Sequence, residues 1–540
     1  MPTLEWIGKS AVLNHHRQVP FRLLKNDETL SADDPGTGNL LVQGDNLEAL
    51  KALLPYYAGQ VKCIYIDPPY NTGNEGWTYN DAVNSPEIRG WLHKTVGKEA
   101  EDLSRHDKWL CMMYPRLSLL REFLREDGII FVSVDENEHR FLSLLMDEVF
   151  GELNRLETLV WKKSYGGGSK SKHIVNLHEY IEVFAKRTEH IVELELPPDE
   201  KALKYYKYKD EKFDKRGPYR FQPLATTSMD DRPNLRYSIP YQGNEIWPEK
   251  QWQWARERTM KALAENELVF TKKKEKWTVS YKQYLKDAEG QERTQKPYSI
   301  VEGVYTQQGT NELKDIFGDG KAFSFPKPRA LIQHLLQFAT DKNSLILDSF
   351  AGSGTTGHAV ISLNKEDGGN RRFILVEMDE RISRTIMAER LRRVTNGYTY
   401  KNSKGDEVAV EGLGGGFRYA TLGASLFDEA GNIAKEVSFA DLARHIYFTE
   451  TGEPMSGGVR GKPSPLLGVR DGIACYLLYN GVLGDQRPDG GNVLTAATLR
   501  DLPPHAGPRV IYSEGCRLSP ARLKQERITF RQIPYQIRVG

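Results

Sequence analysis

The sequence predicts an α/β fold in which a parallel sheet carries helices on both faces and is built from two separated pieces of the chain. Short apolar runs alternate with segments of helical periodicity through residues 40–190, and the alternation resumes after about residue 323. Continuous apolar runs are typical of strands that are buried on both faces of a parallel sheet. Hydrophobic residues make up 39% of the 540 residues, an ordinary value for a globular protein.

The first piece of the sheet begins near residue 40. Its predicted elements are, in order, a strand ending in LLVQGD, the helix NLEALKALLPYY, the strand VKCIYID at 61–67, a helix at about 107–126, the strand IIFVSVD at 129–135, a helix at about 138–150, and the strands TLVWKK and HEYIEVFAK. Pro68 and Pro69 end the second strand, because proline fixes φ and has no amide hydrogen for a sheet ladder. Asp127-Gly128 ends the second helix.

The second piece has a helix near 328–340, the strand SLILD at 344–348, a glycine-rich turn, a helix from about 355, and the strand RFILVEMD at 372–379. These patterns predict a sheet domain formed by residues 1–190 and 323–420. Residues 191–322 form an insertion, and residues 421–540 form a small C-terminal domain.

The insertion has a composition that suits nucleic acid. Residues 201–300 contain 22 Lys and Arg against 14 Asp and Glu, whereas the whole chain has a net charge of only +1. The same residues include four of the nine tryptophans of the chain. Basic side chains can hold phosphates and aromatic rings can stack on bases. A solvated charged surface over a small core explains the same composition equally well. Phosphate contacts are expected at 201–220 and 272–276, and Trp247, Trp252 and Trp254 are candidates for stacking or for the core.

Composition also excludes several classes of protein. No run of about 18 apolar residues exists, so no membrane span is expected. The N-terminal MPTLEWIGKS lacks the pattern of a signal peptide. Four scattered cysteines without C-x-x-C make a disulfide framework or a metal site unexpected. A reducing cytoplasm is therefore the predicted location.

The first motif with a chemical meaning is Asp67-Pro68-Pro69-Tyr70, at the carboxyl end of a predicted buried strand. Ligands bind at this edge of open α/β sheets. The turn offers carbonyl oxygens and the Asp67 carboxylate as acceptors beside an aromatic ring. This combination suits an amino group on a flat ring, with Asp67 and the Pro68 carbonyl accepting its hydrogens and Tyr70 stacking on its face. An ordinary proline turn is the competing interpretation.

The chemistry explains why two acceptors are needed. The amino nitrogen of a base is a poor nucleophile because its lone pair is delocalised into the ring. Two acceptors in near-tetrahedral directions favour an sp³-like nitrogen, and Asp67 stabilises its developing positive charge. A base in duplex nucleic acid must leave the stack to reach such a site.

The second motif is FAGSGTTG at 350–357, directly after the strand LILD that ends at Asp348. Glycines at a strand-to-helix turn allow the backbone to approach a ligand closely. The turn lacks the lysine of a P-loop and the full G-x-G-x-x-G spacing. Glu377 ends the next strand, where an acid can bind the two hydroxyls of a ribose. The pattern predicts nucleoside binding. The alternative interpretation is a tight turn followed by an acid that faces solvent and binds nothing.

These motifs together resemble the amino-DNA methyltransferases. DPPYNTG at 67–73 and LDSFAGSGTTGHAV at 347–360 are similar to the catalytic and S-adenosylmethionine motifs of that family, in the permuted order of its β class. Further similar segments are GDNLEAL, DGIIFVSVDENE, HEYIEVFAK, FPKP and RFILVEMDE. Modification subunits of type III restriction–modification systems share DPPYNTG, and ITFRQIPYQI at 528–537 resembles their C-terminal region more loosely. Ser349 stands where the family often has proline.

The resemblance implies a Rossmann-like methyltransferase sheet, an inserted target-recognition domain and a small C-terminal domain for partner docking or dimerisation. It implies that Asp67, Pro68, Pro69 and Tyr70 hold a flipped base. It implies that the cofactor S-adenosylmethionine is bound by Asp45, Lys327, Asp348, Phe350, Gly352, Gly354, Thr355 and Glu377. Among these, Asp45 has the alternative of a helix N-cap, Lys327 that of a solvated lysine, and Thr355 that of a helix cap.

An acid at the first position of the motif is typical of adenine enzymes in this family. The resemblance therefore implies a site-specific DNA adenine-N6 methyltransferase that acts on double-stranded DNA. It also implies a homodimer and a helicase–nuclease restriction partner. The alternatives are a cytosine-N4 DNA methyltransferase, an RNA methyltransferase, or a subunit whose main role is to read DNA for the partner.

Overall fold

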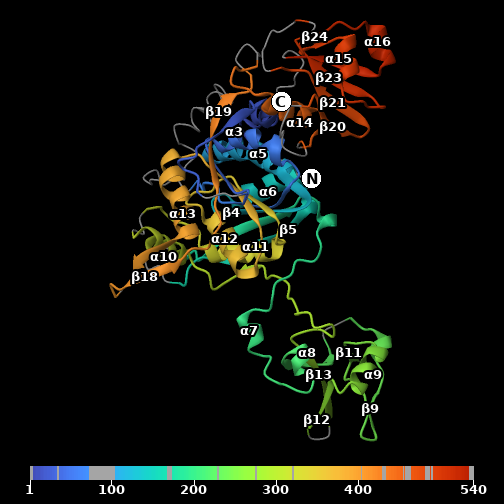
Figure 1. The fold of residues 1–540 in the computed structure, drawn as a ribbon. Helices are drawn as coiled ribbons and strands as arrows, with labels where there is room; N and C mark the ends of the chain where they lie inside the picture. The colour runs from blue at the N-terminus through green and yellow to red at the C-terminus, as the bar shows by residue number, and fades with distance from the viewer. Residues whose placement is uncertain are drawn as a thin grey trace. The chain divides into compact units, whose positions relative to one another are not determined.

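The computed structural model describes residues 4–32, 36–71, 104–166, 173–227, 230–273, 276–318, 322–402, 404–427, 433–453, 455, 464–480, 487 and 490–533. The chain separates into two compact units. One consists of Met1–Glu193 and Tyr298–Gly540, and the other is Leu194–Pro297. Figure 1 follows the chain through both units by colour. Two distant parts of the sequence therefore build one unit, and the segment between them builds the other.

A ten-stranded sheet forms the centre of the first unit, with the order β1-β19-β2-β16-β15-β3-β4-β6-β5-β14. Its six central strands pair in parallel, and they are β19 (Arg418–Ser425), β2 (Leu40–Gln43), β16 (Arg372–Glu377), β15 (Leu345–Asp348), β3 (Val61–Ile66) and β4 (Leu124–Val134). Strands β16 and β15 come from the second piece of the sequence and lie between β2 and β3 of the first. The predicted α/β fold is thus confirmed, with the two pieces interleaved in one sheet.

The edges of the sheet differ from the predicted wholly parallel arrangement. Strand β6 (His178–Ala185) is antiparallel to both β4 and β5 (Arg155–Lys162), and β1 (Arg22–Asn26) is antiparallel to β19. The connection from β5 to β6 contains no described helix, so the chain reverses direction between neighbouring strands. The short β14 (Ile300–Val301) is parallel to β5 at the edge. Because β6 runs backwards, its first residues lie at the edge where the parallel strands end.

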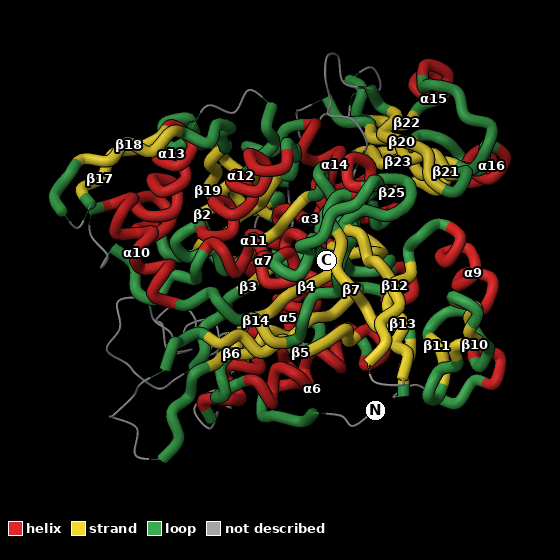
Figure 2. The backbone as a smooth tube through the Cα atoms, turned by 90° about the horizontal axis from the view of Figure 1, so that it is seen from below, coloured by secondary structure: helices red, strands yellow, loops and turns green. Residues whose placement is uncertain are grey.

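Helices cover the two faces of this sheet (Figures 1 and 2). One layer contains α3 (Asn46–Tyr57), α5 (Arg105–Phe123) and α6 (His139–Phe150), with the short α1 (Lys9–Val12) and α2 (His15–Gln18), and the other contains α11 (Arg329–Ala339), α12 (Thr355–Asp367) and α13 (Ala388–Asn396). Neighbouring residues of a strand face opposite layers. On β4, Val132 joins the core beneath α3 and α5, whereas the Phe131 ring meets Phe338 of α11 at 5.7 Å between centroids. Within the described ranges, no helix is long and apolar enough to cross a membrane.

The C-terminal region is continuous with this unit in the structure. The predicted boundary at 420 falls inside β19, and α14 (Phe439–Thr451) buries Leu442 and Ile446 in the main core. A four-stranded sheet follows, formed by β20 (Leu466–Arg470), β21 (Ile473–Leu477), β23 (Arg509–Ser513) and β25 (Ile528–Gln532), with a core cluster of its own. The remaining elements of this region are β22 (Val493–Leu494), α15 (Ala496–Asp501), β24 (Gly515–Cys516) and α16 (Pro520–Gln525). The independent character predicted for residues 421–540 therefore appears only after α14.

The second unit, Leu194–Pro297, is shorter than the predicted insertion at 191–322. The extra residues belong to the first unit, where they form β14 and α10 (Thr306–Phe317). The unit has a three-stranded sheet of β12 (Leu268–Lys273), β13 (Lys276–Tyr284) and β7 (Tyr219–Pro223), with α7 (Glu200–Leu203), α8 (Phe213–Arg216), α9 (Arg256–Ala264) and the short strands β8 (Ala225–Thr226), β9 (Ile239–Tyr241), β10 (Asn244–Ile246) and β11 (Gln251–Trp252). A small core of its own includes Leu224, Ile239 and Trp252.

Candidate active site

Acidic residues stand at the ends of four neighbouring parallel strands. Glu377 ends β16, Asp348 ends β15, Asp67 follows β3 and Asp135 follows β4. The carboxyl ends of parallel strands share one edge of the sheet, where ligands of α/β proteins bind. The sheet order therefore brings together two motifs that are about 280 residues apart in the sequence.

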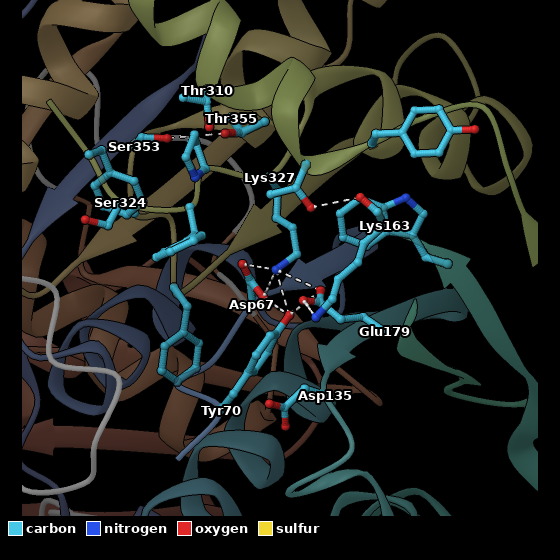
Figure 3. Close-up of a pocket in the computed structure, with 18 of the residues that line it drawn as sticks. Asp67, Tyr70, Asp135, Lys163, Glu179, Thr310, Ser324, Lys327, Ser353 and Thr355 are labelled. Carbon is cyan, nitrogen blue, oxygen red and sulfur yellow. Dashed lines mark hydrogen bonds and ion pairs between the residues drawn. The ribbon is translucent and has the colours of Figure 1, made fainter. Parts of the chain in front are cut away.

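A pocket of about 700 Å³ opens at this edge (Figure 3). It is lined by both motifs, by β6 and by the segment before α11. The predicted site residues that line it are Asp67, Pro68, Pro69, Tyr70, Lys327, Asp348, Phe350, Gly352 and Thr355. Asp45, Gly354 and Glu377 are outside the set of lining residues. The pocket is therefore shared by the predicted base turn and the predicted cofactor loop.

The Asp67 carboxylate is fully engaged by its neighbours. Lys327 Nζ donates to Oδ1 at 2.7 Å and to Oδ2 at 2.8 Å, and the Tyr70 hydroxyl donates to Oδ1 at 2.6 Å. Lys327 Nζ also lies 2.6 Å from the Tyr70 hydroxyl (Figure 3). Burial lowers the pKa of Lys327, but the Asp67 and Glu179 carboxylates outweigh it and the pKa is raised. Lys327 is thus a cation at neutral pH, held against the predicted catalytic acid.

The geometry around Tyr70 is fixed from two sides. Burial, Asp67 and Glu179 all raise the pKa of the Tyr70 phenol well above its ordinary value, so the phenol stays protonated and donates. The Pro69 carbonyl accepts a hydrogen bond from Trp109 Nε1 of α5 at 2.7 Å. The turn is therefore anchored to α5 on one side of the sheet, while Asp67 and Tyr70 line the pocket.

Glu179 and Lys163 are site residues that sequence reasoning missed. Lys163 Nζ donates to Glu179 Oε1 at 3.0 Å, and Glu179 Oε2 lies 3.2 Å from the Tyr70 hydroxyl and 3.5 Å from Lys327 Nζ. Burial raises the pKa of Glu179, but the two lysines outweigh it and the net shift is downward. Glu179 is near the start of β6, and only the antiparallel direction of that strand brings it to the pocket. The same strand contains a second acid, Glu182, so the sequence pattern does not single out Glu179.

The glycine loop between β15 and α12 has a backbone that other residues would strain. Gly352 and Gly354 have φ of +50° and +78°, values that favour glycine. A Cβ at Gly352 would lie 3.1 Å from the Phe323 ring, and one at Gly354 would lie 3.0 Å from the Met387 side chain. Asp348 holds the loop, because it accepts from the Phe350 amide at 3.0 Å and from the Thr356 hydroxyl at 2.6 Å.

Glu377 holds the same loop through hydrogen bonds to backbone amides. Its Oε2 accepts from the Gly352 amide at 2.8 Å, and its Oε1 accepts from the Asp379 amide at 2.9 Å. Burial raises the pKa of Glu377 to about 7, and it also raises the pKa of Asp348 to about 7. These two acids therefore titrate near neutrality, unlike exposed carboxylates.

Thr355 is held by a buried arginine. Arg390 of α13 is 0% exposed and donates to Ser353 Oγ at 3.0 Å and to Thr355 Oγ1 at 2.9 Å. Its second amino nitrogen lies 3.4 Å from a Glu312 carboxylate oxygen. Arg390 was not identified from the sequence, since a basic residue within a helix such as α13 has no distinctive pattern.

Two predicted cofactor residues have other partners. Asp45 caps α3, accepting from the amides of Leu47 and Glu48 at 2.9 and 3.1 Å, and it lies 3.1 Å from Arg116. The helix-cap interpretation of Asp45 thus has direct contacts, and its contact with a cofactor stays a prediction. Lys327, predicted to bind the cofactor, lines the pocket and contacts Asp67, and its contact with the cofactor also stays a prediction.

The aromatic residues singled out in the second unit divide into two groups. Trp252 is 2% exposed and donates from Nε1 to the Tyr237 carbonyl, so its role is in the core. Trp254 is partly buried against the same core, whereas Trp247 is 62% exposed. Part of the basic cluster at 272–276 lies outside the described residues.

Known proteins similar to this chain give its family. A family model named for N6 and N4 methyltransferases and described as DNA methylase matches residues 61–388, which include both motifs and the pocket. The chain belongs to this DNA methylase family. The predicted resemblance to DNA methyltransferases is thereby confirmed. Among the residues that the structure describes, no group of three or more His, Cys, Asp or Glu side chains could hold a metal ion.

Curated relatives of this DNA methylase include modification subunits. The type III restriction–modification enzyme StyLTI Mod subunit of Salmonella typhimurium is 35% identical, over 72% of this chain and 60% of that protein. The EcoPI Mod subunit of Escherichia phage P1 is 36% identical, over 71% of this chain and 64% of that protein. The type II methyltransferase M.KpnI of Klebsiella pneumoniae is 33% identical, over 65% of this chain and 83% of that protein. The chain spans less than two thirds of the length of the type III relatives it matches.

The methylase family implies S-adenosylmethionine as the methyl donor, and the pocket fits that cofactor. The positive-φ glycines leave room for a ligand to approach the loop backbone closely, where a Cβ would already crowd Phe323. Asp348 lines the pocket, and Glu377 lies directly behind Gly352. Carboxylates of this kind suit the hydroxyl and amino groups of a nucleoside. Phe350, which also lines the pocket, supplies an apolar surface.

Proposed function

We propose that this DNA methylase is a site-specific methyltransferase that transfers a methyl group from S-adenosylmethionine to N6 of a flipped adenine in double-stranded DNA. The observation that carries the proposal is that Asp67-Pro68-Pro69-Tyr70 and the glycine loop at 350–355 open on one pocket of about 700 Å³. Methyl transfer needs the acceptor base and the donor at such adjacent positions. The acid at position 67 supports adenine, because this residue type is typical of the adenine enzymes that the sequence resembles.

In the proposed mechanism the bound cofactor supplies an electrophilic methyl group, and the chain positions the nucleophile. Asp67 and the Pro68 carbonyl each accept one hydrogen of the amino group, which returns the nitrogen lone pair from the ring. Tyr70 orients Asp67 through its hydroxyl and offers its ring to the base. Asp67 then stabilises the positive charge that develops on the nitrogen.

The direct test is methyl transfer from labelled S-adenosylmethionine to unmethylated duplex DNA, followed by mass spectrometry of the nucleosides. N6-methyladenine is the expected product. N4-methylcytosine would contradict the role of Asp67 as an adenine determinant. Methylation of RNA alone would replace the DNA substrate, and cofactor binding without any product would favour a subunit that mainly reads DNA.

The second unit is proposed as the target-recognition domain. Its support is the exposure of Lys204, Lys207 and Lys209, the exposed Trp247 ring, and the excess of basic residues. Replacing these three lysines with glutamine should flatten the salt dependence of DNA binding, because each lost phosphate contact removes about 0.9 from the slope of log K against log salt. Binding measured between low and moderate salt checks this. Lys365→Gln, at an exposed position on α12, is the control, and an unchanged slope in the triple variant would remove these lysines from the DNA interface.

The remaining assignments concern assembly. The names of the Mod subunit relatives support the proposal of a modification subunit in a type III restriction–modification system. The proposed homodimer, cytoplasmic location and helicase–nuclease partner rest on the sequence resemblance. The C-terminal sheet of β20, β21, β23 and β25 is the region proposed for partner docking or dimerisation, because its core is separate from the pocket. Light scattering of the full chain tests the dimer. Co-purification with a helicase–nuclease encoded by an adjacent gene tests the partner.

A further inference from the structure

Four charged side chains meet beside Tyr70, and their formal charges cancel. The acids are Asp67 and Glu179, and the bases are Lys327 and Lys163. The side chains of Glu179 and Lys327 are only 11% and 10% exposed. The predicted mechanism uses Asp67 and Tyr70 but gives no role to Glu179 or Lys163. A buried acid that is paired with two lysines at a reaction centre calls for a specific function.

Both oxygens of Asp67 already accept hydrogen bonds. Lys327 Nζ contacts each of them within 2.8 Å, and Tyr70 occupies Oδ1 as well. An amino group that binds to Asp67 therefore competes with Lys327, which contacts both oxygens, and weakens its hold on that carboxylate. Lys327 then needs another anionic partner, since an unpaired buried ammonium is costly. Glu179 Oε2 is already 3.5 Å from Lys327 Nζ, so a small side-chain movement transfers the contact.

Charge gives a second reason for Glu179. The amino nitrogen forms a bond to the methyl carbon, the electron pair of the broken S–C bond stays on sulfur, and the cationic nitrogen then loses a proton to water. The Lys327 ammonium remains close to this nitrogen after it passes to Glu179, and it opposes the developing positive charge. Glu179 offsets Lys327, while its other oxygen is held by Lys163 at 3.0 Å.

We propose that Glu179 is a positioning residue for methyl transfer: it receives Lys327 when Asp67 turns to the amino group, and it keeps the local charge balanced. This inference rests on the proposed function, and it deepens the account of the same site. Glu179 acts apart from the cofactor loop, because none of the contacts of Glu179 reaches residues 350–355. Its effect should thus appear in the transfer step and leave cofactor affinity unchanged.

The test compares Glu179→Gln with wild type in single-turnover methyl transfer to duplex DNA. The transfer rate should fall roughly 10- to 100-fold, the cost expected when one partner of a buried charged pair is removed. The Kd for S-adenosylmethionine should change less than about twofold, because no contact joins Glu179 to the cofactor loop. Glu157→Gln, at an exposed position of β5, is the matched control and should behave as wild type.

A double variant separates charge from shape. Glu179→Gln leaves a net charge of +1 at the site, and adding Lys163→Gln restores neutrality. The double variant should recover at least about threefold of the lost rate. A double variant as slow as the single variant would overturn the proposal, as would a Glu179→Gln enzyme with the wild-type rate or with weakened cofactor binding alone.

Two further measurements keep the outcome decisive. Should Glu179→Gln fail to fold in thermal unfolding, Glu179→Asp keeps the charge with a shorter reach and should give an intermediate rate. A wild-type rate in Glu179→Asp would overturn the positioning role. Absence of methylated product with the wild-type enzyme would instead contradict the proposed function, so the two failures are distinct.

Discussion

Methyl transfer should fall by roughly three orders of magnitude in Asp67→Ala, while binding of S-adenosylmethionine stays near its wild-type strength. The loss follows from removing the acceptor that holds the amino group and stabilises its developing positive charge, an effect comparable to losing one oxyanion-hole donor. Cofactor binding should persist because the contacts of Asp67 are to Lys327 and Tyr70, and none reaches the glycine loop. Single-turnover transfer and equilibrium binding of the cofactor, measured on the same preparation, check both parts.

Asp67→Asn is the informative companion to this variant. The amide keeps one acceptor oxygen but places a neutral group against the Lys327 ammonium, so its rate should lie between wild type and Asp67→Ala. Lys327 keeps Glu179 at 3.5 Å in both variants, and thermal unfolding should therefore show a folded protein. Normal methylation of DNA by Asp67→Ala would refute the proposed mechanism at its first step.

The sequence predicted the positions of the acids at the strand ends because local patterns mark them. A buried apolar run followed by a turn identifies the end of a strand, and parallel strands align their ends, so Asp67 and Asp348 could be brought together without coordinates. The same patterns located the glycine loop, and the structure adds that Gly352 and Gly354 have positive φ. Each of these features depends on residues that are near one another in the chain.

Glu179 and Arg390 were beyond reach for a physical reason. Both act through contacts that span long sequence separations, since Glu179 meets Tyr70 109 residues away and Arg390 meets Ser353 37 residues away. The direction of β6 decides whether Glu179 lies at the pocket or at the opposite edge, and an apolar strand pattern carries no direction. The ion pair of Lys327 with Asp67, over a separation of 260 residues, was hidden in the same way.

The domain boundaries show the same limit. Residues 298–318 were predicted as part of the insertion, yet β14 pairs with β5 and α10 packs against α13 in the first unit. The boundary at 420 was placed where the helix-and-strand alternation ends, but β19 extends to Ser425 through its ladder with β1 and β2. Sheet pairing, which joins distant segments, sets both boundaries.

Glu377→Gln should weaken binding of S-adenosylmethionine by roughly 10- to 100-fold and should also change how stability depends on pH. The affinity loss corresponds to the roughly 1.5–3 kcal/mol of a hydrogen bond to a charged group. It has two sources, namely the predicted contact with the ribose hydroxyls and the hydrogen bond by which Glu377 holds the Gly352 amide in the structure. Isothermal titration with the cofactor measures this part. Unchanged affinity would show that Glu377 neither contacts the cofactor nor shapes the loop that does.

The pH dependence follows from burial, which raises the pKa of Glu377 from 4.5 to about 7 in the folded protein. An acid with a raised folded-state pKa keeps its proton in the native state after the unfolded chain has lost it. The wild-type protein therefore loses stability as pH rises from about 4.5 to about 7, by about 3 kcal/mol from this group, and the loss then levels off.

Glutamine does not titrate, so the Glu377→Gln variant should gain up to that amount of stability relative to wild type between pH 4.5 and pH 7. The pKa of Asp348 is raised in the same direction, and Asp348 is present in both proteins. Its carboxylate is also one of the groups that raise the pKa of Glu377, after burial and Asp379. Denaturant unfolding at pH 5 and pH 8 measures the difference, and equal pH profiles would mean that Glu377 is ionised in the folded protein well below neutrality. A gain in stability at pH 8 with a loss of cofactor affinity would identify Glu377 as a group kept at an energetic cost for binding, because a residue retained for the fold alone would show the reverse.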